Sequence, residues 1–368
     1  MPKVNWYVST QGGDNITTKV LSMSMYWGRT KYLDDYAGGR LQLTINNASN
    51  YAAGLAYGTY LRVTNDKNFS MVYWVQQVEY SDYPGNTGLN TATITCVDGL
   101  GLIGRSQLTA VTLSTTTTVL QGGEVLTAIA YPGSYGSTVG QSTASGTVYT
   151  GTALNRFNLL NATERGRLCV NDSTIAFFGR NQTVATDTGY TIGRTATYTQ
   201  LAYQEFRRIQ NGVQFINTAT ISPDGLASQT STNTASVTTY GRAFYSSSTV
   251  DSTITQASGN ADWVVNTFAD PNSLRFELTF TDVMNETGAL TSFFNQFGAF
   301  TVVRPVLVYY QLPGAAQTSQ TMILEGVNIN VTPQMTTCDV SYSPLTYYQF
   351  FTLDSATLGI LDTSRLGW

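Results

Sequence analysis

The sequence predicts a mainly β protein with two related antiparallel β-barrel or sandwich domains, a small α+β insertion and an extended C-terminal tail. Much of the chain divides into short runs of Val, Ile, Thr and aromatic residues bounded by Asn, Asp, Gly or Pro, a pattern typical of strands. In addition, the runs between Gly39 and Leu100 recur in the same order between Ser273 and Pro344. Because the spacing of this repeat is far longer than a solenoid unit, it indicates two related domains.

The repeat consists of corresponding strand-like blocks separated by turn-forming residues. The blocks of the first copy predict a meander that ends near Leu108. In the first copy the blocks are 40–45, 57–63, 71–78 and 93–98, and in the second they are 274–278, 297–303, 321–327 and 335–340. We predict a first β domain over 1–108, a helix-plus-hairpin insertion over 109–197, a second β domain over 198–349 and a C-terminal docking segment over 350–368.

The insertion carries its own local signals. Thr152 is a suitable N-cap for a helix whose Leu154, Phe157 and Leu160 share one face, and Gly166 is expected to end that helix in the left-handed conformation. A hairpin is predicted next, with strands over 166–170 and 174–178.

Later segments are predicted as strands and one short helix. The run 235–240 has strand texture, and 262–268 is predicted to be a helix that ends before Pro271, because the residue before a proline resists helical angles. The final segment spaces apolar side chains that a free tail would expose. Burying one such side chain stabilises by about 1.5–3 kcal/mol, so docking on the same domain or on a neighbouring subunit is predicted. The docking residues are Leu353, Leu358, Leu361, Leu366 and Trp368.

Composition narrows the class of protein. Charged residues make up 11% of the chain and the net charge is −4, which suits a subunit of a crowded assembly and gives no basic footprint for holding nucleic acid. The three cysteines lie in strand-like runs without metal-site spacing, so buried free thiols are predicted at Cys96, Cys169 and Cys338. We expect a soluble protein made in a cytoplasm, without a membrane anchor or signal peptide.

The chain contains no histidine, which excludes Ser-His-Asp catalysis and the common zinc peptidase motifs. We predict no enzyme activity, cofactor or metal site. A glycosidase needs only two suitably spaced carboxylates and therefore stays open as an alternative. The candidates, which a structural interpretation assigns to turns instead, are Asp34, Asp35, Asp82, Asp98, Glu124 and Glu164.

Aromatic residues leave a second alternative open. Tyr73, Trp74 and Tyr80 could form a sugar-stacking platform, although neighbouring aromatic residues on a strand more often form core pairs. We favour core packing for these side chains.

Several short motifs follow one another in a fixed order along the chain. The N-terminal motifs are Tyr26-Trp-Gly-Arg29, Leu33-Asp-Asp-Tyr-Ala-Gly38, Leu41-Gln-Leu-Thr-Ile-Asn-Asn47, Gly58-Thr-Tyr-Leu-Arg-Val63 and Ala92-Thr-Ile-Thr-Cys-Val-Asp-Gly-Leu100. The hairpin entry Glu164-Arg-Gly-Arg-Leu168 follows, and the ending contains Leu353-Asp-Ser-Ala-Thr-Leu-Gly-Ile-Leu-Asp362. This ordered set, which covers most of the chain, resembles the minor tail proteins of long-tailed bacteriophages.

The duplicated domains also resemble the hub proteins of phage baseplates and contractile injection machines. That resemblance implies a homotrimer whose two domains per subunit present a pseudo-sixfold ring, connect the tail tube to the tip or fibre and line a DNA channel. Its implied partners are tail-tube or distal tail proteins, the tape-measure protein and a tip or fibre protein. It implies a virion component assembled in the host bacterial cytoplasm. A neutral to acidic lumen should let DNA pass without specific binding.

Two related alternatives remain open, a distal tail ring protein and a carbohydrate-binding adsorption protein. The sequence also departs from the hub pattern. Only the second copy keeps the glycine of the third block, in Gly326-Val327, whereas the first copy has Tyr73-Trp-Val-Gln76. Equal roles for the two domains are therefore in question.

Overall fold

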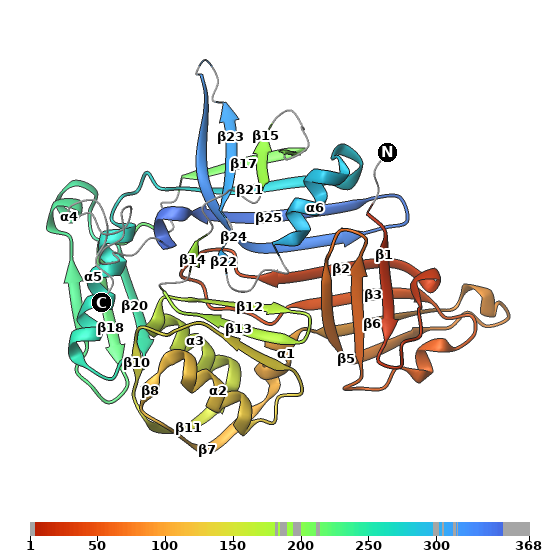
Figure 1. Ribbon diagram of the computed structural model, residues 1–368, viewed down its shortest axis with the longest axis horizontal. Coiled ribbons are helices and arrows are strands. Elements are labelled where there is room, and N and C mark those ends of the chain that lie inside the picture. The colour runs from red at the N-terminus through yellow and green to blue at the C-terminus, as the bar shows by residue number, and fades with distance from the viewer. Residues whose placement is uncertain are drawn as a thin grey trace.

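A single large β-sheet dominates the molecule, which confirms the predicted mainly β class (Figure 1). The computed structural model describes residues 4–180, 183–184, 190–193, 200–210, 214–296, 302–303, 305–311, 314 and 316–348. The sheet has 13 strands, and the described strands form no closed barrel. Both copies of the sequence repeat contribute to this one sheet.

The first copy forms one half of the sheet, in the order β1-β4-β5-β6-β3-β2. A meander was predicted here, and that prediction is wrong, because β3 pairs with β6 and not with β4. The chain crosses from β3 to β4 before the hairpins begin, which gives a Greek-key order. The strands are β1 (Trp6–Thr10), β2 (Val20–Gly28), β3 (Arg40–Asn46), β4 (Tyr60–Asn65), β5 (Ser70–Ser81) and β6 (Thr91–Val97).

The second half repeats this pairing order. In the second half the strands pair in the order β17-β21-β25-β24-β23. The corresponding order in the first half is β2-β3-β6-β5-β4. Most of the predicted block 297–303 lies outside the described residues, and β23 occupies the corresponding place. The strands are β15 (Tyr190–Gly193), β16 (Gln200–Ala202), β17 (Glu205–Gln210), β21 (Leu274–Thr281), β23 (Val306–Gln311), β24 (Gln317–Val331) and β25 (Thr336–Pro344).

A β-bulge occupies the same place in each half. The register of β5 on β6 shifts between Val75 and Gln77, and that of β24 on β25 shifts between Leu324 and Gly326. The extra residues are therefore Gln76 and Glu325. A bulge leaves one residue unpaired and increases the local twist, so it fixes the register on both sides of itself.

The two halves join where β2 pairs antiparallel with β24, from Met23 opposite Val331 to Gly28 opposite Gly326. Gly28 has φ +93°, and a Cβ there would lie 2.2 Å from the carbonyl oxygen of Glu325. A Cβ on Gly326 would lie 2.5 Å from the carbonyl oxygen of Arg29. The close backbone approach explains why the third block of the second copy keeps a glycine.

The insertion packs against one face of the sheet. Its helix α3 (Ala153–Glu164) begins as predicted, since Thr152 Oγ1 accepts a hydrogen bond from Asn155 N. The predicted ending at Gly166 is wrong, because Arg165 takes the left-handed conformation with φ 54°. The elements α1 (Gly99–Arg105) and β7 (Gln107–Leu113) lead into the insertion. Its other elements are α2 (Thr118–Ala128), β8 (Thr116–Thr117), β9 (Ser134–Ser137), β10 (Thr143–Ala144), β11 (Thr147–Thr152), and the predicted hairpin β12 (Arg167–Asn171) and β13 (Thr174–Phe178).

A smaller unit lies at one end of the sheet. The strand predicted over 235–240 is wrong, because α4 (Thr234–Tyr240) begins where Asn233 Oδ1 accepts from Ser236 N, and this capping bond outweighs the β-branched composition. The helix predicted over 262–268 exists and is longer, as α5 (Ile254–Phe268). The strands of this unit are β18 (Thr218–Pro223), β19 (Gln229–Thr232) and β20 (Phe244–Thr249). Outside it lie α6 (Thr287–Asn295) and the strand pair β14 (Thr183–Val184) and β22 (Val302–Val303).

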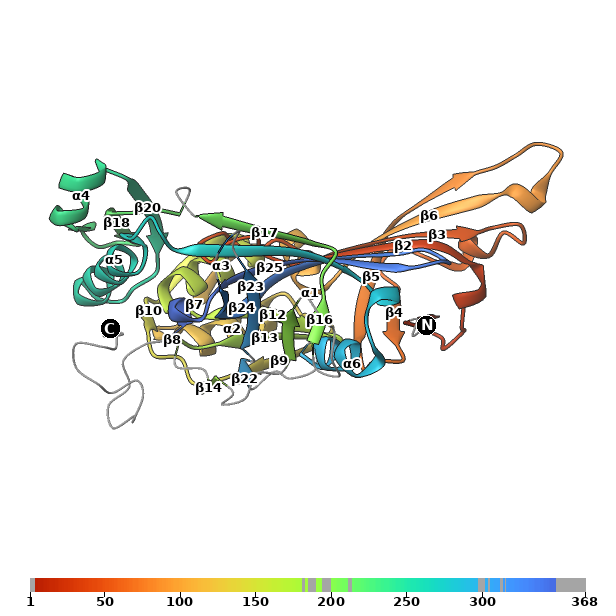
Figure 2. The same cartoon turned by 90° about the horizontal axis from the view of Figure 1, so that it is seen from above.

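Turned by 90°, the molecule shows one side of the large sheet largely free of helices, although next to the bulges both faces are buried, at residues 71–75 of β5 and 322–325 of β24. The helices α1, α2, α3 and α6 all lie on the same side of it (Figure 2). Side chains that point to this side form the main core, which includes Leu41, Ile94, Phe276 and Val340. The residues that alternate with them point to the uncovered side. We call this side the open face.

Candidate functional site: the open face of the sheet

The open face is lined by polar side chains from strands of both halves. Because side chains alternate along a strand, one set of positions faces away from the core on every strand. Apart from Arg275, which is 7% exposed, these positions are half-buried or exposed, whereas their neighbours in the core are buried. The set comprises Ser24, Tyr26, Arg40, Gln42, Thr44, Gln77, Glu79, Thr93, Thr95, Glu205, Arg207, Arg275, Glu277, Thr279, Asn328, Asn330, Asp339 and Ser341.

One uncharged row crosses the boundary between the halves. Along β24, β2, β3, β6 and β5, the residues that lie opposite one another are Asn330, Ser24, Gln42, Thr95 and Gln77. None of these side chains can form an ion pair with a phosphate. The row thus offers hydroxyl and amide groups with no net charge.

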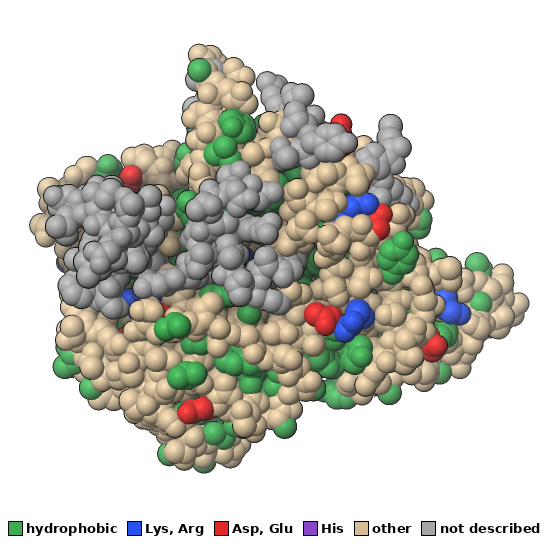
Figure 3. Space-filling model, in the orientation of Figure 1, with side chains coloured by type: hydrophobic (Ala, Val, Ile, Leu, Met, Phe, Trp, Pro, Cys, Tyr) green, Lys and Arg blue, Asp and Glu red, His purple; other side chains and the backbone are tan. Residues whose placement is uncertain are grey.

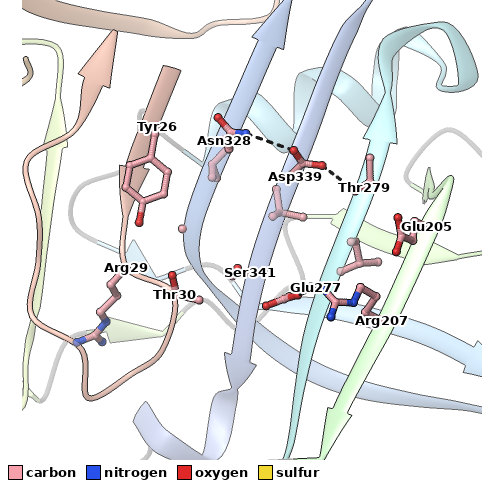
Figure 4. A pocket seen from close by; sticks show the side chains of 14 residues that line it. Tyr26, Arg29, Thr30, Glu205, Arg207, Glu277, Thr279, Asn328, Asp339 and Ser341 are labelled. Carbon is pink, nitrogen blue, oxygen red and sulfur yellow. Dashed lines mark hydrogen bonds and ion pairs between the residues drawn. The ribbon is translucent and has the colours of Figure 1, made fainter. Parts of the chain in front are cut away.

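A second row contains the charged part of the open face. It borders a shallow cavity of about 240 Å³ between β2 and β17 (Figure 4). Asp339 accepts from Thr279 Oγ1 at 2.7 Å and from Asn328 Nδ2 at 3.3 Å. Glu277 accepts from Arg207 Nη1 at 2.9 Å and from Arg275 Nη2 at 2.8 Å. The arginines are therefore paired with a carboxylate on the same face.

The charges of the open face are nearly balanced. Its arginines are Arg40, Arg207 and Arg275, and its carboxylates are Glu79, Glu205, Glu277 and Asp339. Carboxylates slightly outnumber arginines, which gives a neutral to weakly acidic surface. The opposite side of the molecule is also poor in charge, with few and scattered charged side chains among polar ones (Figure 3). Among the described residues, neither the open face nor the side shown in Figure 3 has the cluster of unpaired basic side chains that strong binding of a polyanion needs.

The carboxylates considered for a glycosidase have structural partners. Asp34 accepts from Lys31 N at 3.0 Å, and Glu124 accepts from Ser114 N at 2.8 Å. Asp98 and Glu164 are buried and accept several backbone N–H groups. Asp35 and Asp82 are exposed. The hydrogen bonds favour the structural interpretation for four of these six residues.

Asp98 is the N-cap of α1. Its Oδ1 accepts from Gly39 N and Gly101 N, both at 2.8 Å, and so ties the start of β3 to the helix. Burial raises the pKa of Asp98 to about 6 from its ordinary 3.8, although these N–H groups favour the charged form. The folded protein therefore binds this proton more tightly than the unfolded chain does.

This shift predicts a pH dependence of stability. The stabilisation that comes from the protonated carboxyl is complete below about pH 3.8 and is lost as the pH rises through about 6. Relative to Asp98→Asn, which keeps an acceptor oxygen, the free energy of unfolding of the wild type should fall by about 2 kcal/mol between pH 4 and pH 7. Urea unfolding of both proteins across this range measures the difference. Parallel pH profiles would contradict the assignment.

The predicted alternative of a sugar-stacking platform is not assembled. Tyr73 and Trp74 are buried in the sheet, at 0% and 5% exposure, which confirms core packing for them, and only Tyr80 is exposed. A cavity of about 590 Å³ lies beside Trp74, lined also by Tyr60, Arg62 and Tyr131. Trp74 and Tyr131 contact each other at its wall, with ring centroids 6.1 Å apart.

The cysteines lie apart from the open face. Cys96 and Cys338 are buried and free, as predicted, whereas Cys169 is half-buried. Burial raises the pKa of Cys169 to about 11, so its thiol stays protonated at neutral pH. Among the described residues, no three His, Cys, Asp or Glu side chains gather closely enough to hold a metal ion.

No helix within the described part of the chain is long and apolar enough to cross a membrane.

The docking residues predicted in the C-terminal segment, Leu353, Leu358, Leu361, Leu366 and Trp368, lie outside the described residues. Their docking stays a prediction.

Sequence reasoning missed one buried charge cluster behind the open face. Arg29 belongs to the Tyr26-Trp-Gly-Arg29 motif, and its Nε lies 2.8 Å from Oε2 of Glu325, the bulge residue of β24. Tyr348 donates to Glu325 Oε1 at 2.6 Å. The two charges lie 296 positions apart in sequence, so no local pattern points to their pairing. The structure reveals it because the bulge of β24 places Glu325 next to the end of β2.

No family model and no curated protein matches the sequence. Solved structures do match. A tail protein from Neisseria meningitidis superimposes with a TM-score of 0.64 at 9% identity, over 93% of this chain and 96% of that one. The chain has the fold of phage tail proteins. A 43 kDa tail protein of prophage MuSo2 from Shewanella oneidensis gives a TM-score of 0.60 at 12% identity, over 95% and 98%.

A third solved structure with this fold is a component of a secretion system. The c3393 protein of Escherichia coli gives a TM-score of 0.54 at 9% identity, over 92% of this chain and 76% of that one. That protein is described as a component of the type VI secretion system with structural similarity to the T4 tail proteins gp27 and gp5. The predicted resemblance to tail and hub proteins is thus confirmed at the level of the fold.

Proposed function

We propose that this protein is a structural virion protein, the hub of a phage tail tip, which connects the tail tube to the tip or fibre as a homotrimer. One observation carries the proposal: two halves with the same strand order and the same bulge lie side by side in one sheet. An internal duplication accounts for this repeat. Two equivalent halves per subunit allow three subunits to fill six equivalent places against a sixfold tube.

The open face is the surface proposed to line the DNA channel. It is continuous across both halves, Glu277 pairs with Arg207 and Arg275, and carboxylates slightly outnumber arginines on it. Because affinity for DNA comes mainly from unpaired cations near phosphates, such a surface lets the duplex pass without holding it. Catalysis forms no part of this function.

The proposed partners follow from the position of a hub. They are a tail-tube or distal tail protein on one side, a tip or fibre protein on the other, and the tape-measure protein in the lumen. The C-terminal segment, with its apolar residues from Leu353 to Trp368, is proposed to dock on a neighbouring subunit. Assembly is proposed to take place in the cytoplasm of the host bacterium.

The number of copies in the particle tests this function. Quantitative mass spectrometry of purified particles should find three copies per tail, and a particle reconstruction should place Gln42 and Thr95 toward the tail axis. Six copies would instead support a distal tail ring protein. A protein that is absent from particles, or whose open face points away from the axis, would contradict the proposal.

A further inference from the structure

The pairing of β2 with β24 joins the two halves of one subunit. The same pairing between equivalent strands of two subunits is geometrically possible, because the equivalent edges have no strand partner among the described residues. In that junction, β2 pairs with the part of β24 that follows the bulge, Gly326–Val331. The corresponding part of β5 follows the bulge at Gln76 and covers residues 77–81. We call its outer edge the arm edge. Within the described residues, the arm edge has no strand partner, because β4 pairs with β5 only as far as Trp74.

The second half has the complementary unpaired edge. β17 pairs with β21 in the way that β2 pairs with β3. The other edge of β17 has no strand partner in the described part of the chain. The arm edge in the first half therefore corresponds to the edge of β24 that pairs with β2. The free edge of β17 in the second half corresponds to the edge of β2 that pairs with β24.

The register of the missing contact follows from the existing junction. Met25 lies opposite Ile329 on one side and Leu41 on the other. Counting from the bulges, Ile329 corresponds to Tyr80. Leu41 lies opposite Cys96, and the residue in its place in the second half, Phe276, lies opposite Arg208. The template thus places Arg208 of β17 opposite Tyr80, and its neighbours follow as Phe206 with Asp82, Arg207 with Ser81, Ile209 with Glu79 and Gln210 with Val78.

The chemistry of the two edges is complementary in this register. Tyr80 is 48% exposed, and a guanidinium opposite an exposed tyrosine gains a cation–π contact. Asp82 would lie diagonal to Arg208 on one face, and Glu79 would lie diagonal to Arg207 on the other. Opposite charges thus meet on both faces of the pair.

The arm also has the exposure expected of a contact surface. Together with β6, it projects beyond the rest of the molecule (Figure 2). Tyr83 and Leu89 at its tip are 50% and 56% exposed. Projecting, unprotected strand edges with exposed apolar side chains tend to pair with another chain.

We propose that the arm edge of one subunit pairs antiparallel with β17 of a second copy of this chain, with Tyr80 opposite Arg208. This inference rests on the proposed function and identifies the contact by which its subunits assemble. The contact is head-to-tail, so repetition continues the sheet from one subunit to the next and closes into a ring if the rotation permits.

Cysteine cross-linking tests the register. Cα atoms of directly opposite residues in an antiparallel pair lie about 4.5–5.5 Å apart, within the range of a disulfide. The variant Tyr80→Cys/Arg208→Cys should therefore form intersubunit disulfides on mild oxidation, read as covalent dimers and trimers on a non-reducing gel. The control Tyr80→Cys/Arg207→Cys places one thiol on the opposite face and should give at least about tenfold less product. Tyr80→Cys alone measures the background from the native cysteines.

A charge exchange gives a second readout. Asp82→Arg and Arg208→Glu should each raise the dissociation constant of the oligomer by about fivefold, and the double variant should restore it. Sedimentation measures all three. Single and double variants that weaken assembly to the same extent would contradict the pairing of these edges.

The outcomes separate this inference from the hub function. A trimer by native mass without cross-linking at Tyr80 and Arg208 would overturn the edge pairing and leave the hub standing. A cross-linked ladder that extends beyond three subunits would support the edge pairing and overturn the trimer. A wild-type protein that stays monomeric at the highest attainable concentration would overturn the edge pairing.

Discussion

Replacing Arg29 with Met should lower the free energy of unfolding by about 3–5 kcal/mol, because it leaves the buried carboxylate of Glu325 without its cation. Both side chains of this pair are almost fully buried, at 2% and 1% exposure. Burial disfavours the charged guanidinium, but Glu325 and the neighbouring tyrosines outweigh it and raise the pKa of Arg29 above its ordinary value. The guanidinium also lies over the rings of Tyr32 and Tyr36, at 4.6 and 4.7 Å from their centroids.

Denaturant unfolding followed by tryptophan fluorescence measures this loss. A matched control is Arg62→Met, since Arg62 forms an exposed pair with Asp172 at 44% and 35% exposure and should cost no more than about 1 kcal/mol. The double variant Arg29→Met/Glu325→Leu should recover much of the loss, because no unpaired charge remains buried. Equal effects of Arg29→Met and Arg62→Met would refute the role given to burial.

Replacing Glu164 with Ala should also lower the free energy of unfolding by about 3–5 kcal/mol, because several buried donors lose their acceptor at once. Glu164 is fully buried at the end of α3. Its carboxylate accepts from Thr118 Oγ1 at 2.6 Å, from Ser142 N at 2.9 Å and from Arg180 N at 2.9 Å. It therefore fastens α2, α3 and two loops of the insertion to one another.

Thermal and denaturant unfolding of Glu164→Gln and Glu164→Ala separate charge from hydrogen bonding. The amide keeps one acceptor oxygen and should cost less than Ala. Glu124→Ala is the control, because its hydrogen bond to Ser114 N is exposed and should be worth only about 1 kcal/mol. If Glu124→Ala and Glu164→Ala destabilise alike, the insertion does not depend on this carboxylate.

Local patterns in the sequence predicted several elements well. Thr152 and the apolar face of the following helix correctly located α3, and the strand-like runs 166–170 and 174–178 correctly located the hairpin β12 and β13. Such features depend on neighbours in the chain, so a sequence displays them directly. The run 235–240 shows the limit of this reasoning, since one capping side chain made a helix from residues with strand propensity.

Pairing between distant strands was beyond the reach of the same patterns. The meander prediction failed because alternation of apolar residues identifies a strand but not its neighbour in the sheet. The junction of Gly28 with Gly326 joins residues from opposite ends of the chain. Likewise, the open face exists only because strands from both halves align their outward positions in register.

The sequence by itself determined the mainly β class, the repeated order of strand blocks and the absence of histidine chemistry, because composition and short-range periodicity carry that information. Only the tertiary structure decided that both copies share one sheet, that Arg29 neutralises Glu325, and that the outer edges of β17 and of residues 77–81 have no strand partner among the described residues. These features arise from backbone hydrogen bonds and buried charges between residues hundreds of positions apart, and no local pattern records which distant groups will meet.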